Sequence, residues 1–212
     1  MGVQARRKRE KEQRRGQILD AAREVLFHEG MAGTSMNRIA GAAEVSVGTI
    51  YVYFQNKEEL FAALQEEGLD ILDDMVRRAA DEGEGPAEKL RLIALAYLRF
   101  SRDHQKYFDV YNFFLTAPEV TFPDPLKRRI DTYGERILSH VEGVIRQITA
   151  GDSQTVLDPR RCAVVYWSTL HGLLQFRKLR DTILAGRDMR ELYTYAVDCL
   201  LRSFQCEAAS GA

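Results

Sequence analysis

Apolar residues recur every three or four positions along almost the whole chain, and alternating apolar and polar runs are rare. The first apolar stripe consists of Ile18, Ala21, Ala22, Val25 and Leu26. A period of three to four is typical of amphipathic helices, whereas half-buried strands show a period of two. The pattern predicts an all-α protein whose first helix begins at about Glu12 and ends at Gly30.

Three helix-capping signals follow the first stripe. Thr34 and Ser46 stand directly before two short stretches, and Asn56 is followed three residues later by Glu59 in the form of a capping box. A side-chain oxygen at such a position accepts a backbone N–H group that the helix itself leaves unpaired. The signals predict two short helices and then a long helix over about 57–80.

The rest of the sequence predicts longer helices separated by breaks rich in glycine and proline. The segment DEGEGP ends one helix and starts the next at Pro86, a residue favoured in the first turn. That helix, to about His104, is apolar over most of its circumference and should form the buried centre of the larger part. About nine helices are expected in all, the later ones being the aromatic cluster YFDVYNFF and stripes over about 126–148, 160–179 and 192–204.

Composition narrows the class of protein. The hydrophobic fraction of 45% and the charged fraction of 29% are those of an ordinary globular protein. No apolar run approaches the roughly 18 residues of a membrane span, and the three cysteines form no CxxC pair, which favours reduced thiols. We therefore expect a cytoplasmic protein that is neither exported nor inserted into a membrane.

The net charge of −1 hides an asymmetry between the two ends of the chain. Residues 1–58 carry ten Lys and Arg against seven acids, whereas the remainder carries 20 against 24. A basic N-terminal part on an acidic body indicates a polyanion partner at one end. The run from Arg6 to Arg15 either reaches a DNA minor groove or is a solvated or disordered arm, and the sequence leaves both interpretations open.

Two short helices joined by a tight turn, braced by a first helix and followed by a long one, predict a helix-turn-helix and then an all-α domain. Val45, Ile50 and Phe54 would face the first helix. At the front of the third helix, Gly48 would let the backbone approach DNA closely, and Val47 could contact a thymine methyl group. Each outward residue also has an ordinary structural interpretation as a cap, a turn or a half-buried side chain.

Residues 34–60, TSMNRIAGAAEVSVGTIYVYFQNKEEL, resemble the TetR family of bacterial transcription regulators, whose pattern runs T-x-x-x-I-A-x-x-A-G-V-S-x-G-x-L-Y-x-H/Y-F-x-x-K-E-x-L. The resemblance implies that Val47 and Gly48 approach bases and that the flanking hydroxyls and cation contact phosphates. The candidate DNA-binding residues are Thr34, Ser35, Ser46, Val47, Gly48, Thr49, Tyr51, Tyr53 and Lys57.

Two positions depart from the family pattern. Glu44 replaces the usual glycine of the turn, so the turn must take a conformation that a non-glycine residue tolerates, or be slightly strained. Val52 stands where an aromatic or basic residue often helps to grip the DNA backbone. These changes affect the expected affinity and operator sequence and leave the expected fold unchanged.

The resemblance also implies a division of labour, with a DNA-binding domain at 1–56 and an effector-binding and dimerisation domain at 57–212. A homodimer would form through the last two helices, about 160–179 and 192–204. Aromatic and histidine side chains are the candidates for an effector pocket, although aromatics at helical spacing are also typical of a core. The candidates are Tyr97, Phe100, His104, Tyr111, Phe114, Tyr133, Tyr166, Trp167 and His171.

The function expected from these features is that of a repressor that binds a near-palindromic double-stranded DNA operator as a dimer and is released by a small, largely apolar or aromatic effector. The alternatives are a DNA-binding dimer controlled by a protein partner and a nucleoid-type binder with weak sequence preference. The chain has none of the motifs GxSxG, GxGxxG, GxxxxGK[ST] or HExxH, and its four histidines include no pair at i, i+3 or i+4. We therefore expect no enzyme activity, catalytic residue, metal site or cofactor.

Overall fold

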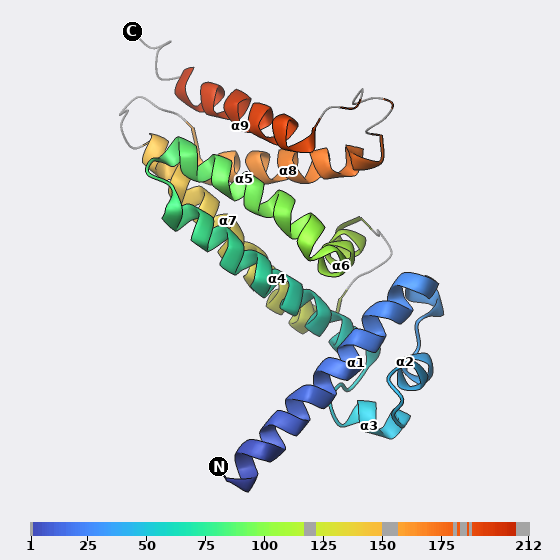
Figure 1. Cartoon of the computed structure of the whole chain (residues 1–212). Coiled ribbons are helices and arrows are strands. Elements are labelled where there is room, and N and C mark those ends of the chain that lie inside the picture. Colours follow the sequence, from blue (N-terminus) through green and yellow to red (C-terminus); the bar gives the residue numbers. More distant parts are fainter. Residues whose placement is uncertain are drawn as a thin grey trace. The chain divides into compact units, whose positions relative to one another are not determined.

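The computed structural model describes residues 2–116, 122–149, 157–179, 182, 186 and 188–206, and within these ranges every regular element is a helix (Figure 1). The all-α prediction is confirmed. No helix in the described part of the chain is long and apolar enough to cross a bilayer. The helices are α1 (Val3–Gly33), α2 (Met36–Ala42), α3 (Val47–Tyr51), α4 (Lys57–Glu82), α5 (Pro86–Asp103), α6 (Gln105–Thr116), α7 (Asp124–Thr149), α8 (Pro159–Gln175), a 3-10 turn (Phe176–Leu179) and α9 (Met189–Cys206).

Two of the three predicted caps are confirmed and one is wrong by a single residue. The Ser46 side chain accepts the backbone N–H of Thr49 at 3.0 Å, and Asn56 Oδ1 accepts that of Glu59 at 2.8 Å. The cap of α2 is Ser35 rather than Thr34. Thr34 is buried, and its hydroxyl donates to the carbonyl of Gly30 at 2.6 Å. Because this side chain is packed and occupied, the next residue, Ser35, caps the helix instead.

The first helix is longer than predicted at its N-terminal end. It starts at Val3 instead of Glu12, because Arg, Lys, Glu and Gln form helix well even without an apolar stripe. The predicted stripe is buried from Ile18 onwards, which confirms its role as the packed face. At Gly30 the backbone takes a φ of 66°, which only glycine adopts without cost, and the regular helix ends there as predicted.

The chain divides into two compact units, which we describe separately. Unit 1 contains residues 1–68 and 106–131, and unit 2 contains residues 69–105 and 132–212. Unit 1 has one continuous apolar core, to which α1, α2, α3, the start of α4 and Val110 of α6 all contribute. The predicted domain boundary at residue 56 is a division of function and stays a prediction.

Unit 2 is built around α5, whose inward residues are buried as predicted. Buried tyrosines tie the neighbouring helices to it: the Tyr166 hydroxyl donates to the carbonyl of Leu90 at 2.5 Å, and that of Tyr193 donates to the carbonyl of Leu170 at 2.7 Å. Burial raises the pKa of both hydroxyls, so they stay neutral donors. These bonds fix α8 against α5 and α9 against α8.

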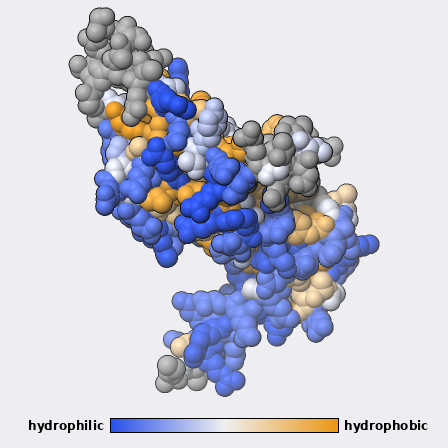
Figure 2. Space-filling view, turned by 45° about the horizontal axis from the view of Figure 1, so that its top comes forward, coloured by the Kyte–Doolittle hydropathy of each residue, from blue (hydrophilic) through white to orange (hydrophobic). Residues whose placement is uncertain are grey.

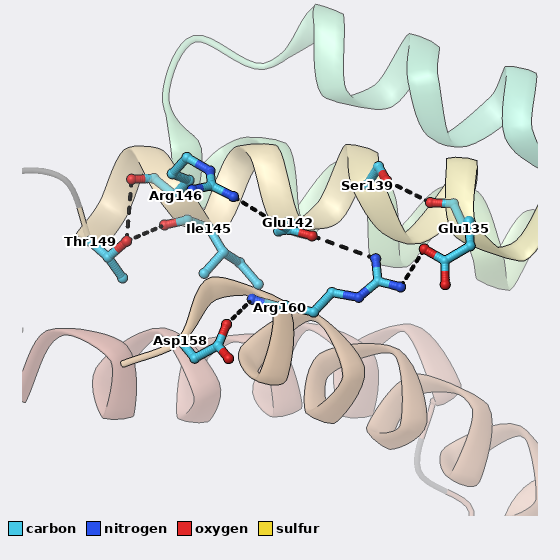
Figure 3. Close-up of polar contacts among 8 residues, drawn as sticks. All are labelled: Glu135, Ser139, Glu142, Ile145, Arg146, Thr149, Asp158 and Arg160. Carbon is cyan, nitrogen blue, oxygen red and sulfur yellow. Dashed lines mark hydrogen bonds and ion pairs between the residues drawn. The ribbon is translucent and has the colours of Figure 1, made fainter. Parts of the chain in front are cut away.

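Polar contacts hold the start of α8 against α7 (Figure 3). Asp158 caps α8 by accepting the backbone N–H of Arg160 at 2.9 Å. The guanidinium of Arg160 then reaches across to Glu135 at 2.5 Å and to Glu142 at 3.5 Å. The two glutamates are seven residues apart on α7, so they lie on one face of that helix and a single arginine can meet both.

Candidate nucleic-acid interface

The turn between α2 and α3 is a tight helix-ending motif that normally requires glycine. The N–H of Val45 donates to the carbonyl of Ala40 at 3.0 Å, and that of Glu44 donates to the carbonyl of Gly41 at 3.2 Å. This pair of bonds defines a Schellman motif, which places one residue in the left-handed region. That residue is Glu44, with a φ of 52°, the one non-glycine residue of the described chain with a positive φ.

The front of α3 is polar and open. Ser46 Oγ lies 2.8 Å from Thr49 Oγ1, so the two hydroxyls sit together beside the exposed Gly48. A Cβ placed on Gly48 would meet only Ser46 Oγ, at 3.7 Å. Packing within the chain therefore does not require glycine at this position, whereas close approach by an outside partner would.

The back of α3 belongs to the core of unit 1. Ile50 is fully buried and Phe54 almost so, as predicted, and Val45 packs against the same cluster. Val47 is half-buried and also packs against it, which leaves only part of its side chain for a base contact.

The aromatic residues after α3 divide between solvent and core. Tyr51 is 53% exposed, whereas Tyr53 is half-buried against the core cluster. Val52 is 73% exposed, the highest value among the exposed large apolar residues that the structure describes. The sequence-based prediction left Val52 out of the candidate site because it departs from the family pattern. Its position between two tyrosines at a helix end was the signal that could have placed it on this surface.

The remaining candidate DNA-binding residues are less accessible to an outside partner. Thr34 is enclosed and its hydroxyl is engaged, and Ser35 uses its side chain to cap α2. Lys57 is half-buried at the first position of α4, directly after the capping residue Asn56. The structure thus gathers Ser46, Gly48, Thr49 and Tyr51 on an open surface and places Thr34 inside.

The candidate effector residues fall into two groups. Seven lie in unit 2, where Tyr97 and Tyr166 are fully buried. The hydroxyl of Tyr97 is hydrogen-bonded to Nδ1 of His171 at 2.7 Å, and its ring centroid lies 4.7 Å from that of Trp167. Burial lowers the pKa of His171, which favours its neutral form. These contacts are those of a packed, polar-satisfied interior.

Tyr111 and Phe114, the other two, line a pocket of about 290 Å³ in unit 1. Gln65 also lines it; this side chain is 5% exposed and has no hydrogen-bond partner among the described residues. Lys127 Nζ, at the rim, forms an ion pair with Asp131 at 2.5 Å. A largely apolar cavity lined by one amide without a hydrogen-bond partner among the described residues suits an apolar ligand that carries a polar group. The full lining is Gln65, Tyr111, Phe114, Leu115, Phe122, Lys127, Ile130 and Asp131.

A short helix with an open polar front, set on a packed core by a tight turn, defines a helix-turn-helix DNA-binding protein. A family model described as "Bacterial regulatory proteins, tetR family" matches residues 18–64, and one described as "Tetracyclin repressor-like, C-terminal domain" matches residues 90–200. The chain belongs to the TetR family of bacterial transcriptional regulators.

Two relatives give the range of similarity. The HTH-type transcriptional activator FasR of Mycolicibacterium smegmatis is 34% identical over 52% of this chain and 51% of its own length. The fatty acid metabolism regulator protein of Bacillus subtilis is 26% identical over 73% of this chain and 78% of its own. The chain therefore spans about half the length of the first relative.

Solved structures share the fold. The regulator FadR from Bacillus subtilis, in complex with stearoyl-CoA, superposes with a TM-score of 0.72 at 24% identity, over 87% of this chain and 96% of that one. AibR, in complex with isovaleryl coenzyme A and operator DNA, gives 0.65 at 21% identity, over 90% and 97%. At these identities the likeness shows the fold.

Proposed function

We propose that this protein is a transcriptional repressor that binds a near-palindromic DNA operator as a homodimer and is released from it by an effector whose apolar part enters the C-terminal domain. The observation that carries the proposal is the open front of α3, where Ser46, Gly48 and Thr49 are presented by a helix whose back is fully packed. Small side chains let the backbone enter the major groove, and the flanking hydroxyls can bind phosphates.

Two variants separate phosphate contact from base reading. Lys57→Ala should weaken binding to operator and random duplex alike and lower the salt dependence by about one unit, because one phosphate contact is lost. Val47→Lys should change which sequence is preferred. Binding isotherms on both duplexes at several salt concentrations give the result, and equal losses on every duplex for both variants would contradict the assignment.

The proposed homodimer uses α8 and α9. Val164 and Val165 on α8 and Tyr195 on α9 are each about half exposed or more, although they are apolar or aromatic. Large exposed apolar residues on adjacent helices are typical of a subunit interface. Val165→Lys should give a monomer by sedimentation and abolish tight binding to the palindrome. The matched change Val52→Lys should leave the dimer intact.

We propose that the pocket in unit 1 is the effector site and that the effector is a coenzyme A thioester. The apolar wall around Phe114 and Ile130 would take the acyl chain, and the amide of Gln65 would donate to a carbonyl oxygen. The volume of about 290 Å³ is at the lower end for ligand pockets, which favours a short or branched acyl group. The complexes of FadR with stearoyl-CoA and of AibR with isovaleryl coenzyme A support this class of ligand.

The pocket can influence DNA binding because α6 forms part of its wall and is joined to α1. Arg23 of α1 is buried, and its guanidinium lies 4.5 Å from the ring centroid of Tyr107 and 3.2 Å from that tyrosine's hydroxyl. Lys106 of α6 also forms an ion pair with Glu24 of α1. A ligand that displaces α6 would therefore disturb α1, against which α2 packs. Release requires the ligand to prefer the displaced arrangement.

The test titrates operator-bound protein with acyl-CoAs of increasing chain length, with free CoA and free fatty acids as controls. We expect release by one range of acyl chains and none by free CoA. Ile130→Trp, which fills the pocket, should abolish the response while operator affinity without ligand is unchanged. Failure of every acyl-CoA would favour the alternative, a DNA-binding dimer controlled by a protein partner. Transcript levels after gene deletion decide between repressor and activator.

A further inference from the structure

The first turns of α1 form a helical arm whose side chains are exposed over residues 4–14. The core begins only at Ile18. With a rise of 1.5 Å per residue, the exposed part over residues 4–14 is about 15 Å long. This length corresponds to about four steps of duplex DNA at 3.4 Å each.

The charges of the arm oppose its own stability. Residues 3–15 carry seven cations and two acids, a net charge of +5. Cations in the first turns of a helix interact unfavourably with its positive dipole end, and α1 has no acid in its first turn. The arm also has no apolar stripe to pack on a protein, and its surface is predominantly hydrophilic in Figure 2. Short isolated helices are marginal in water. The arm would therefore be stabilised by binding an external anion, and not by packing within the chain.

One face of the arm carries the unpaired charge. Arg7, Lys11 and Arg14 are spaced at i, i+4 and i+7, so they form a single stripe. Among the described residues, Arg7 and Lys11 have no ion-pair partner, and Arg14 meets only the neutral Gln17, at 2.9 Å. The two acids of the arm pair with other cations.

Glu10 accepts a hydrogen bond from Arg6 at 2.7 Å, and Glu12 forms an ion pair with Lys8 at 3.9 Å. Such exposed pairs contribute only a few tenths of a kcal/mol each. Both acids therefore pair with cations outside the stripe.

The base of the arm is fixed beside the DNA-reading helix. Gln17 Nε2 donates to the carbonyl of Ala43, in the turn between α2 and α3, at 2.7 Å. The guanidinium of Arg15 lies 5.4 Å from the ring centroid of Phe54 and forms an ion pair with Glu67 at 3.1 Å. The stripe therefore begins within a few residues of the surface that the proposed function assigns to DNA.

We propose that Arg7, Lys11 and Arg14 form a second DNA contact, in which the arm lies along the sugar-phosphate backbone beside the bases that α3 reads. Double-stranded DNA is the occupant because its charge complements the stripe and because the arm starts at the helix-turn-helix. The proposal rests on DNA binding by α3, and it adds sequence-independent affinity and a longer footprint.

The test compares two triple variants of equal charge in the full-length protein. Arg7→Gln with Lys11→Gln and Arg14→Gln should lower the slope of log affinity against log salt by roughly two to three, and affinity at 0.15 M salt by on the order of tenfold to a hundredfold. Arg6→Gln with Lys8→Gln and Arg9→Gln removes the same charge from the other faces. This control should lower the slope by less than about one.

A third variant, Glu10→Gln with Glu12→Gln, should raise affinity for every duplex and leave thermal stability unchanged, because the arm packs on nothing. An unchanged salt slope in the first triple, equal losses in both triples, or no gain in the third variant would each overturn the proposal. Failure of the proposed function looks different. In that case, the unmodified protein would show no preference for operator over random duplex, whatever the arm carries.

Discussion

Tyr51 and Tyr166 are the same residue type in helices of the same chain, yet their surroundings are opposite. Tyr51, at the end of α3, is 53% exposed and has no hydrogen-bond partner among the described residues. Tyr166, in α8, is fully buried and donates to the carbonyl of Leu90. A buried hydroxyl must find a partner to offset the loss of water, whereas an exposed one remains available to a ligand. The free hydroxyl of Tyr51 therefore lies on a surface that is open to a partner, and the paired hydroxyl of Tyr166 lies in the interior.

The largest effect is expected from removing the buried ring. Tyr166→Ala should lower the free energy of unfolding by about 3–5 kcal/mol, since it leaves a cavity and an unpaired carbonyl. Chemical denaturation at a fixed protein concentration measures this free energy. Tyr166→Phe is the matched control and should lose only about 1–2 kcal/mol, the share of the hydrogen bond. A loss below about 1 kcal/mol for the alanine variant would mean that the buried Tyr166 stabilises the fold no more than the exposed Tyr51 does.

Removing the exposed ring should change binding and leave stability alone. Tyr51→Ala should weaken operator affinity by about tenfold, equivalent to about 1.4 kcal/mol. Its stability should stay within about 0.5 kcal/mol of the unmodified protein, because the side chain lies on the surface. Tyr51→Phe tests the hydroxyl alone by fluorescence anisotropy. A variant that unfolds more easily but binds normally would place Tyr51 with the core residues instead.

Glu44 lies beside the open surface of α3, and its distinguishing feature is its left-handed backbone conformation. Glu44→Gly should raise stability by about 1 kcal/mol, because glycine takes a left-handed conformation without steric cost. Operator affinity should also rise, since a carboxylate near phosphates is removed. Glu44→Ala separates the two effects: it removes the charge but keeps the Cβ, so affinity should rise without the gain in stability. Equal melting temperatures for all three proteins would show that the turn is unstrained.

The smallest effect concerns pH and the buried cluster of unit 2. Burial lowers the pKa of His171 from its ordinary value of 6.5, so the unfolded chain binds the proton more readily than the folded one. Stability should therefore fall as pH drops through about 6.5 towards the lower folded pKa. His171→Gln should flatten this part of the profile, whereas His28→Gln, on the surface, should not. A profile that is identical with and without His171 would contradict this.

Features that depend on neighbouring residues were predictable from the sequence. The caps Ser46 and Asn56 and the start at Pro86 each act within three residues, so the local pattern carries their signal. The choice between Thr34 and Ser35 could not be made in this way, because both can cap a helix. The burial of Thr34 against the core decided it.

Features that depend on distant residues were not predictable. Tyr111 and Tyr97 give the same sequence signal, yet one lines a pocket and the other fills a core. Gln65 comes from α4 and Lys127 from α7, so only the folded chain brings them to one cavity. The start of α1 at Val3 was missed for another reason: an apolar stripe was required, and the high helix propensity of charged residues was overlooked.

The core of unit 1 has a practical consequence for chimaeras in which the DNA-binding domain of one regulator is joined to another. Val110 of α6 lies in the same apolar cluster as Ile39 and Ile50, together with Leu60 and Phe61 at the start of α4. A module cut at residue 56 would leave the inner side of that cluster open to water and would need a foreign α6 of matching shape. Working chimaeras of this protein should therefore transfer the segment around Val110 together with the first 68 residues, as two discontinuous pieces of one cassette.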